Sequence, residues 1–337
     1  FLAFLRSYIV VEGNDQRFLS SRTGKRTFVL DSRPQISQTA SICGKKEGEG
    51  PLSGGFDMVL TDDIWGEKSW ELAESKMQRE ALRLAIEKRG ICEADIDCMF
   101  AGDLLNQCIG AHYALENMRI PFFGLYGACS TFCEGMSLAA MLVDAGFSGR
   151  SACITSSHFC SAEKQFRMPL GYGGQRTPTA QWTATAAGAA IIEPGAGVNI
   201  LSVTPGRIVD MGISDASNMG AAMAPAALDT LEALFGDTGT SPADYDLILT
   251  GDLGTVGSDI LCDMASRKNT DIYAKHEDCG CMIFDAEKQD MHAGGSGCGC
   301  IASVFCSEII KRLERGEIGR MILMATGALM NTQSLYQ

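Results

Sequence analysis

The sequence predicts an α/β protein made of two copies of one folding unit, and three observations support that prediction. EADIDCMFAGDLLNQ, near residue 100, resembles PADYDLILTGDLGTV near residue 250, so that Asp103 pairs with Asp252. LVDAGFSGRSACITSS (142–157) matches RLERGEIGRMILMATG (312–327) in the same order. In both copies short apolar runs alternate with helical stretches, a pattern typical of parallel sheets covered by helices. Two stacked βαβαβ halves then give five layers, α/β/α/β/α.

The first half is expected to begin with an amphipathic helix, SWELAESKMQREALRLAIEKRG, that leads into the apolar strand CMFAG (98–102). Gly-Asp at the end of this strand favours a turn, and a helical segment follows it. The remaining elements are the strand IPFFGLYG, a helix over about 130–145, the strand SACITSS, a loop over 160–185 and the closing strand TAAGAAIIEPG.

The second half repeats this order. AALDTLEALFGDTG is its first helix, LILTG its first strand and CGCMIFD (279–285) its next strand; a helix over about 297–314 leads into MILMATG. The halves are therefore placed at 24–195 and 196–337, and the second is expected to lack its last strand. Residues 1–23 open with FLAFLRSYIVV and without Met, so we treat them as an extension of doubtful authenticity.

Composition argues against several kinds of partner. The net charge is −13, whereas affinity for nucleic acids depends on Lys and Arg neutralising phosphates, so no nucleic-acid partner is expected. Apolar runs fall short of the roughly 18 residues that a transmembrane helix needs, so no transmembrane segment is expected. Many of the 14 cysteines lie in apolar runs, where a free thiol acts as a small apolar side chain, and a reducing compartment is therefore expected.

A cysteine at the start of a predicted helix is the first candidate site residue. GLYGACSTFCEG (124–135) places Cys129 between an apolar run and that helix, where the positive end of the helix dipole favours a thiolate. Ligand crevices in such sheets lie beyond the carboxyl ends of the strands. His158, Asp103 and Asp252 each follow a predicted strand, so we expect all four residues at that edge.

The motif G-A-C-S-T inside a duplicated half resembles the thiolase and ketosynthase superfamily, which implies a thiolase-like fold. Further motifs together resemble the family of stage V sporulation protein AD: KEGEGPL (46–52), AGDLLNQ (101–107), LYGACST (125–131), TSSHF (155–159), EKQFRMPLGYGGQRTPTAQW (163–182), NMGAAMAPAA (218–227), DYDLILTGDLG (244–254) and MHAGGSGCGC (291–300).

The family resemblance implies a fold used for binding rather than condensation. The implied ligand is dipicolinic acid (pyridine-2,6-dicarboxylate), alone or as its calcium chelate, and the implied role is its uptake into the developing spore and its release at germination. The implied partners are membrane proteins of the same operon type, with this chain lying peripherally on the spore inner membrane. Superfamily members commonly dimerise through the strand near IPFFGLY, so a homodimer is expected.

The alternative is a condensing enzyme, a ketosynthase or thiolase that acts on acyl-CoA or an acyl-carrier protein with Cys129 as nucleophile. Such an enzyme needs a thiolate, an oxyanion hole and two histidines, or a histidine and an asparagine, from the second half. By the repeat, the first histidine belongs just after LILTG, where Asp252 stands instead. A carboxylate there raises the pKa of a neighbouring thiol. His292 is a candidate for the second position, so the machinery is incomplete and we expect no enzyme.

A binding site for a planar diacid needs donors for two carboxylates and an apolar slot for the ring. Backbone N–H groups at the start of the helix after Ser130 can donate hydrogen bonds to an anion. An arginine guanidinium can bind a carboxylate through two parallel hydrogen bonds. Trp182 and Phe166 either stack on the ring or anchor the loop, and Asp103 and Asp252 either cap helices or contact the ligand. No metal and no cofactor are expected. The predicted ligand-binding residues are Cys129, Ser130, His158, Lys164, Arg167, Gln175, Asp252 and His292.

Overall fold

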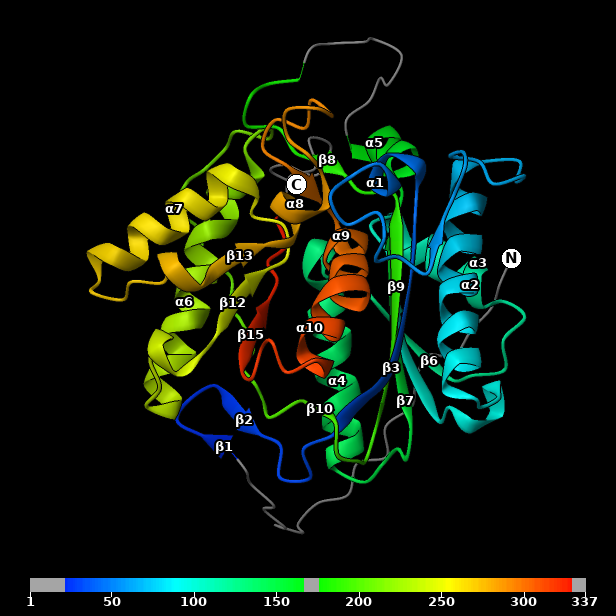
Figure 1. Ribbon diagram of the computed structural model, residues 1–337, viewed down its shortest axis with the longest axis horizontal. Helices are drawn as coiled ribbons and strands as arrows, with labels where there is room; N and C mark the ends of the chain where they lie inside the picture. Colours follow the sequence, from blue (N-terminus) through cyan, green and yellow to red (C-terminus); the bar gives the residue numbers. More distant parts are fainter. Residues whose placement is uncertain (1–21, 167–175, 329–337) are drawn as a thin grey trace.

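Helices and sheets alternate in five layers across the protein (Figure 1). The computed structural model describes residues 22–166 and 176–328. From one side to the other, the layers are helices α2 and α3, a seven-stranded sheet, helices α4, α9 and α10, a three-stranded sheet, and helices α6 and α7. The predicted layered α/β fold is confirmed.

The larger sheet has the order β10-β3-β9-β7-β5-β6, with β4 paired to β3. All its strands except β10 come from the predicted first half, and β10 lies just beyond the predicted boundary at residue 195. Strands β5, β6 and β7 are parallel, whereas β9 runs antiparallel to both β3 and β7. Small residues allow helices to cover β9, every residue of which is buried. The strands are β3 (Gln35–Cys43), β4 (Met58–Val59), β5 (Cys98–Gly102), β6 (Phe122–Leu125), β7 (Ser151–Ser157), β9 (Ala186–Glu193) and β10 (Val198–Asn199).

The helices of the first half begin and end at residues suited to those positions. Ser69 caps α2 by accepting the Leu72 N–H, and Gly90 ends it with a φ of 73° that favours glycine. Helix α2 buries one face on the sheet, and α4 covers the other face. The helices are α1 (Lys45–Gly48), α2 (Trp70–Arg89), α3 (Ile109–Leu115), α4 (Thr131–Asp144) and α5 (Phe159–Phe166).

The second half builds a smaller sheet with the order β13-β12-β15, all parallel. A separate ladder joins β8 (Trp182–Thr183) to β14 (Gly295–Ser296) and so ties the two halves together. The other elements are α6 (Met219–Thr238), β12 (Leu247–Thr250), α7 (Gly254–Arg267), β13 (His276–Asp278), α8 (Cys279–Ile283), α9 (Cys298–Val304), a π turn (Phe305–Ile309), α10 (Ile310–Glu314) and β15 (Met321–Met324).

One predicted strand is wrong. Residues 279–285 were expected to be a strand, but Cys279–Ile283 form helix α8 and the strand is the preceding His276–Asp278. The side chain of Asp278 accepts the Cys281 N–H at 3.2 Å and so caps the short helix. The apolar run CGCMIF fits a buried helix turn as well as it fits a strand, and the cap decides between them.

Equivalent side chains make equivalent contacts in the two copies. Asp97 Oδ2 accepts the N–H groups of Gly149 and Arg150 at 2.7 and 3.1 Å. Asp246 Oδ2 accepts those of Gly319 and Arg320 at 2.8 and 3.0 Å. The duplication read from the sequence is therefore present in the hydrogen bonds that join the start of one strand to the turn before its parallel neighbour in the sheet.

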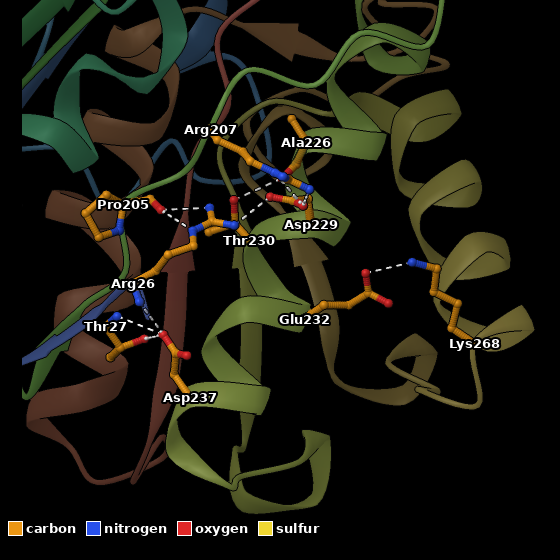
Figure 2. A network of polar contacts seen from close by, with 10 residues as sticks. All are labelled: Arg26, Thr27, Pro205, Arg207, Ala226, Asp229, Thr230, Glu232, Asp237 and Lys268. Atoms are coloured by element: carbon orange, nitrogen blue, oxygen red, sulfur yellow. Dashed lines mark hydrogen bonds and ion pairs between the residues drawn. The ribbon is translucent and has the colours of Figure 1, made fainter. Parts of the chain in front are cut away.

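A small sheet at one end of the molecule is pinned to helix α6. It consists of β1 (Arg22–Thr23), β2 (Thr27–Val29) and β11 (Ser202–Val203). Asp237 accepts the N–H groups of Arg26 and Thr27 at 2.7 and 2.9 Å, and Asp229 pairs with Arg26 and Arg207 at 2.7 and 2.6 Å, as Figure 2 shows. These contacts fix the start of the described chain against the second half.

Strand β15 occupies the place of β7 but has a different neighbourhood. β7 lies between β5 and β9, whereas within residues 22–166 and 176–328 β15 pairs with β12 alone. A cavity of about 2420 Å³ runs beside β15, between it and the segment 197–217, and extends to Cys129. In the same described ranges, no helix combines the length and the apolar character needed to cross a bilayer.

Candidate functional site

Cys129 lies where strand β6 ends and helix α4 begins. Ala128–Ser130 form a single 3₁₀ turn, and Ala128 takes a φ of 52°. The Cys129 side chain is buried at 7% exposure, and Cys129 and Ser130 both line the cavity. Ser130 Oγ donates to the Gly127 carbonyl at 2.6 Å and makes no cap bond to α4. The Ser130 hydroxyl therefore accepts no hydrogen bond from the first N–H groups of α4.

Asp252 follows strand β12 and lies against the Cys129 thiol, and its carboxyl is 1% exposed. Its Oδ2 accepts the Gly297 N–H at 2.8 Å, while Oδ1 is buried with no hydrogen-bond partner of normal geometry among the described residues. Gly297 has a φ of 104°, and a Cβ there would lie 2.7 Å from Ser157 Oγ, so only glycine can present this N–H.

Burial and charge together keep the Cys129 thiol protonated and leave the Asp252 carboxyl about half protonated at pH 7. Burial raises the pKa of Asp252 to about 7. Burial, and then the neighbouring Asp252 carboxyl, raise the pKa of the Cys129 thiol well above its usual range. The carboxyl at this position therefore suppresses the thiolate, as expected from the sequence, and the helix start does not overcome it.

Two more carboxyls are buried in the first half, Asp103 directly after β5 and Glu74 on helix α2. Asp103 accepts the N–H groups of Leu105 and Ala111, each at 2.7 Å, so it serves the turn and start of α3. Glu74 accepts from Ser156 and Ser161 at 3.1 and 2.6 Å. Burial raises the pKa of Asp103 to about 6 and that of Glu74 to about 8. The capping role proposed for Asp103 is present, whereas Asp252 instead binds the glycine-rich loop.

His158 follows strand β7, but it is turned away from the cavity. Its Nδ1 accepts the Cys160 N–H at 3.2 Å, and its Nε2 donates to the Asp63 carbonyl at 2.8 Å. The ring is 2% exposed, and burial lowers its pKa, so it is neutral at pH 7. His158 is absent from the described residues that line the cavity. Its predicted contact with a ligand stays a prediction, and this geometry gives it a loop-anchoring role.

Two other predicted site residues, His292 and Lys164, make contacts away from the cavity that reaches Cys129. His292 bonds through Nδ1 to the Thr177 carbonyl at 2.7 Å and through Nε2 to Asp290 at 3.2 Å. Lys164 pairs with Glu71 at 2.8 Å on an exposed face of α5. Neither is among the described residues that line the cavity. Arg167 and Gln175 lie outside the described residues, as does the side chain of Phe166.

The structure adds a stack of aromatic and cationic groups to the cavity wall. Phe159 and Trp182 stack with ring centroids 3.8 Å apart and an interplanar angle of 11°. The Arg176 Cζ lies 5.0 Å from the Trp182 centroid and 5.8 Å from the Phe159 centroid, and Lys46 Nζ lies 4.4 Å from the Trp182 centroid. Trp182 was predicted to stack on a ligand ring or to anchor a loop. The signal that points to Arg176 is its place in GYGGQRTPTAQW, six residues before Trp182.

The chain matches the family model described as stage V sporulation protein AD over residues 24–337. It is 43% identical over 316 residues to stage V sporulation protein AD of Bacillus subtilis (strain 168), an alignment that covers 94% of this chain and 93% of the relative.

Among solved structures, 3-oxoacyl-[acyl-carrier-protein] synthase III from Aquifex aeolicus VF5 aligns with a TM-score of 0.55 at 12% identity, over 88% of this chain and 96% of that one. A single-residue variant of OleA from Xanthomonas campestris aligns with a TM-score of 0.59 at 15% identity, over 90% of this chain and 97% of that one. Likeness at these identities establishes the thiolase-like fold and no activity. On the family match and the identity to the curated relative, the chain belongs to the stage V sporulation protein AD family.

Proposed function

We propose that this protein is a receptor for dipicolinic acid that does not turn its ligand over, and that it serves the uptake of dipicolinic acid into the developing spore and its release at germination. Membership of a sporulation family supports the process. The observation that carries the binding role is the burial of the Cys129 thiol against the Asp252 carboxyl, at the position where a condensing enzyme would need a histidine. Burial and this carboxyl both raise the pKa of the thiol and so disfavour the thiolate that a nucleophile needs.

Ligand binding is proposed at the Cys129 end of the cavity. Pyridine-2,6-dicarboxylate is far smaller than about 2420 Å³, so the ligand fills only one part of it. The first amides of α4 suit one carboxylate, since N–H groups at a helix start favour anions. The neutral thiol of Cys129 adds a weak donor and an apolar surface.

The second candidate is a condensing enzyme acting on acyl-CoA or an acyl-carrier protein through Cys129. The observation that favours it is the cysteine at the start of α4 in a fold shared with 3-oxoacyl-[acyl-carrier-protein] synthase III. Against it, His158, His276 and His292 each bond to groups other than the sulfur: the Asp63 carbonyl, Thr250 Oγ1 and the Thr177 carbonyl.

Partners and location follow from the same proposal. The protein is proposed to act with membrane proteins of the same operon type at the spore inner membrane. A homodimer is proposed through β6, the edge strand of the larger sheet, where Phe123 and Tyr126 are 38% and 54% exposed. A calcium ion is proposed to enter with the ligand, as its chelate.

Titration calorimetry with dipicolinate tests the proposal. The wild-type protein is expected to bind, and Cys129→Leu, which fills the space beside Asp252, is expected to weaken binding at least 10-fold. Cys92→Ala is the matched control, because Cys92 is exposed, and it should bind as the wild type does. Absence of binding by the folded wild-type protein would contradict the proposed function.

A further inference from the structure

We propose that Cys262 is a second reactive thiol of this protein, with His276 as its general base, and that it forms mixed disulfides with small disulfides that carry positive charge. The site lies in the second half, between helix α7 in the outer layer and strand β13 of the smaller sheet (Figure 1). Dipicolinate plays no part in this chemistry, so the inference is independent of the proposed function.

The Cys262 thiol lies against the imidazole of His276. Cys262 Sγ and His276 Nδ1 are 3.8 Å apart, and the hydrogen bond between a nucleophile and its base is often long when no substrate is bound. Cys262 is half-buried, whereas Cys129 is buried, so a small reagent reaches Cys262 from solvent with less rearrangement of the protein.

The far side of the imidazole determines which nitrogen carries the proton. Thr250 Oγ1 donates to Asp278 Oδ2 at 2.6 Å, and a hydroxyl has one proton to donate. The same oxygen therefore accepts from His276 Nε2, which lies 2.9 Å away. With its proton on Nε2, the neutral ring keeps a lone pair on Nδ1 for the Cys262 thiol. The four side chains thus follow the order of a nucleophile, its base and the groups that orient the base.

Burial sets the resting protonation of the thiol and of the ring. Burial, and then the charges of Asp259 and Asp271, raise the pKa of the Cys262 thiol. Burial lowers the pKa of His276. At pH 7 the thiol is therefore protonated and the ring is neutral, so attack by the sulfur depends on a base that takes its proton, and His276 Nδ1 is placed to do so.

Thiol–disulfide exchange is the reaction that this arrangement supports. The Cys262 proton passes to His276 Nδ1 while the sulfur attacks one sulfur of a disulfide R–S–S–R. A bond forms between Sγ and that sulfur, and the original S–S bond breaks. The leaving thiolate takes the proton from the imidazolium, which gives the mixed disulfide at Cys262 and one free thiol R–SH. The small disulfide is reduced as the cysteine is oxidised, so no other reactant is needed.

Two carboxylates select the charge of the small disulfide. Asp259 and Asp271 act electrostatically on the Cys262 sulfur, and neither has an ion-pair partner among the described residues. Asp263 on the same helix, in contrast, pairs with Arg267 at 2.8 Å. Unit charges about 4 Å apart interact by about 1 kcal/mol in water. Two unpaired carboxylates therefore favour a reagent that carries ammonium groups over one that carries carboxylates, by about 10-fold in rate.

Peptide mass spectrometry after brief exposure to cystamine at about pH 7 measures how fast each cysteine forms a mixed disulfide. Cys262 of the wild-type protein is expected to react, and His276→Gln, which cannot take the proton, is expected to react about 100-fold more slowly there. The exposed Cys92 in the same sample is the matched control and should react equally in both proteins. Dithiodipropionate, an anionic disulfide, is expected to modify Cys262 about 10-fold more slowly than cystamine does, and Asp259→Asn should narrow that difference.

Replacements of Thr250 separate an orienting role from a structural one. Thr250→Val removes the hydroxyl that orients the imidazole and should slow the reaction of Cys262 about 10-fold. Thr250→Ser keeps the hydroxyl and should retain the wild-type rate. Thermal unfolding establishes that each variant is folded before it is treated.

Three outcomes would overturn the inference. The first is an equal rate at Cys262 in the wild type and in the folded His276→Gln protein. The second is a wild-type protein in which Cys92 is modified and Cys262 is not. The third, equal rates with cystamine and with dithiodipropionate, would remove the assigned charge preference. Dipicolinate titration of the same samples reports on the proposed function separately, because no step at Cys262 involves that ligand.

Discussion

Replacing Asp252 by Asn should activate the Cys129 thiol. Asn keeps an oxygen for the Gly297 N–H, so the loop contact at 2.8 Å is preserved while the carboxylate charge is removed. Two unit charges about 4 Å apart interact by about 4 kcal/mol at an effective dielectric constant of about 20. That energy corresponds to a change of about 1000-fold in an equilibrium constant, here the ratio of thiolate to thiol. Burial remains, so the pKa falls without reaching the range of a catalytic cysteine.

The rate of alkylation by iodoacetamide measures this change. Removing the charge therefore raises the thiolate fraction up to about 1000-fold, and a thiolate of lower pKa is less nucleophilic, with a Brønsted slope of about 0.4–0.5. The net increase expected for Cys129 is therefore about 10- to 100-fold at about pH 9, where the wild-type Asp252 is ionised. Peptide mass spectrometry reads Cys129 and the exposed Cys92 in the same sample. An unchanged ratio of the two rates would refute the electrostatic reasoning.

Three further predictions concern acid groups, packing and assembly. Burial raises the pKa of Glu74 from 4.5 to about 8, so its contribution to stability is full below about pH 4.5 and is lost as the pH rises through about 8. Glu74→Gln should therefore flatten the fall of the unfolding free energy between about pH 5 and pH 9, measured by urea unfolding. Equal slopes for the variant and the wild type would contradict this. Gly188→Ala should destabilise the protein by about 1–3 kcal/mol, because its Cβ would lie 2.4 Å from the Ala302 carbonyl oxygen. Gly236→Ala in helix α6 has open space around it and should stabilise the protein by about 0.5–1 kcal/mol. Similar unfolding midpoints for the two variants would contradict this account of the packing. Phe123→Asp on β6 should convert the proposed dimer to a monomer, as measured by light scattering. Phe147→Asp, at an 83% exposed position, is the control and should leave the dimer intact. If Phe123→Asp remains a dimer, the dimer interface does not use β6.

Most of the fold was predicted from the internal repeat, because the repeated residues bind backbone N–H groups at equivalent turns in both copies. Asp97 and Asp246 accept two N–H groups each at equivalent turns. Each copy therefore keeps an Asp before one strand and a Gly-Arg pair before another, and both are visible in the sequence. The strand at 279–285 was wrong because the side chain of Asp278, rather than the apolar run, decides that segment. Asp278 directly before this segment is a helix-start signal in the sequence, and the apolar run was given more weight than that signal.

The candidate site was predicted in part. The contact of Cys129 with Asp252 followed from aligning the two copies, since both residues follow strands that end at one edge. The orientation of His158 did not follow, because it depends on a carbonyl of Asp63, 95 residues away in the sequence. The stacking of Phe159 on Trp182 did not follow either, because no local sequence pattern brings these two residues together.

Incubation of the wild-type protein with an acyl-CoA, followed by intact-protein mass spectrometry and a dipicolinate titration of the same sample, tests the central claim most directly. A protonated thiol next to Asp252 predicts dipicolinate binding, an unchanged protein mass and no release of free CoA. A stoichiometric acyl adduct mapped to Cys129, with equimolar CoA released, would contradict the claim that this cavity holds a ligand without reacting with it.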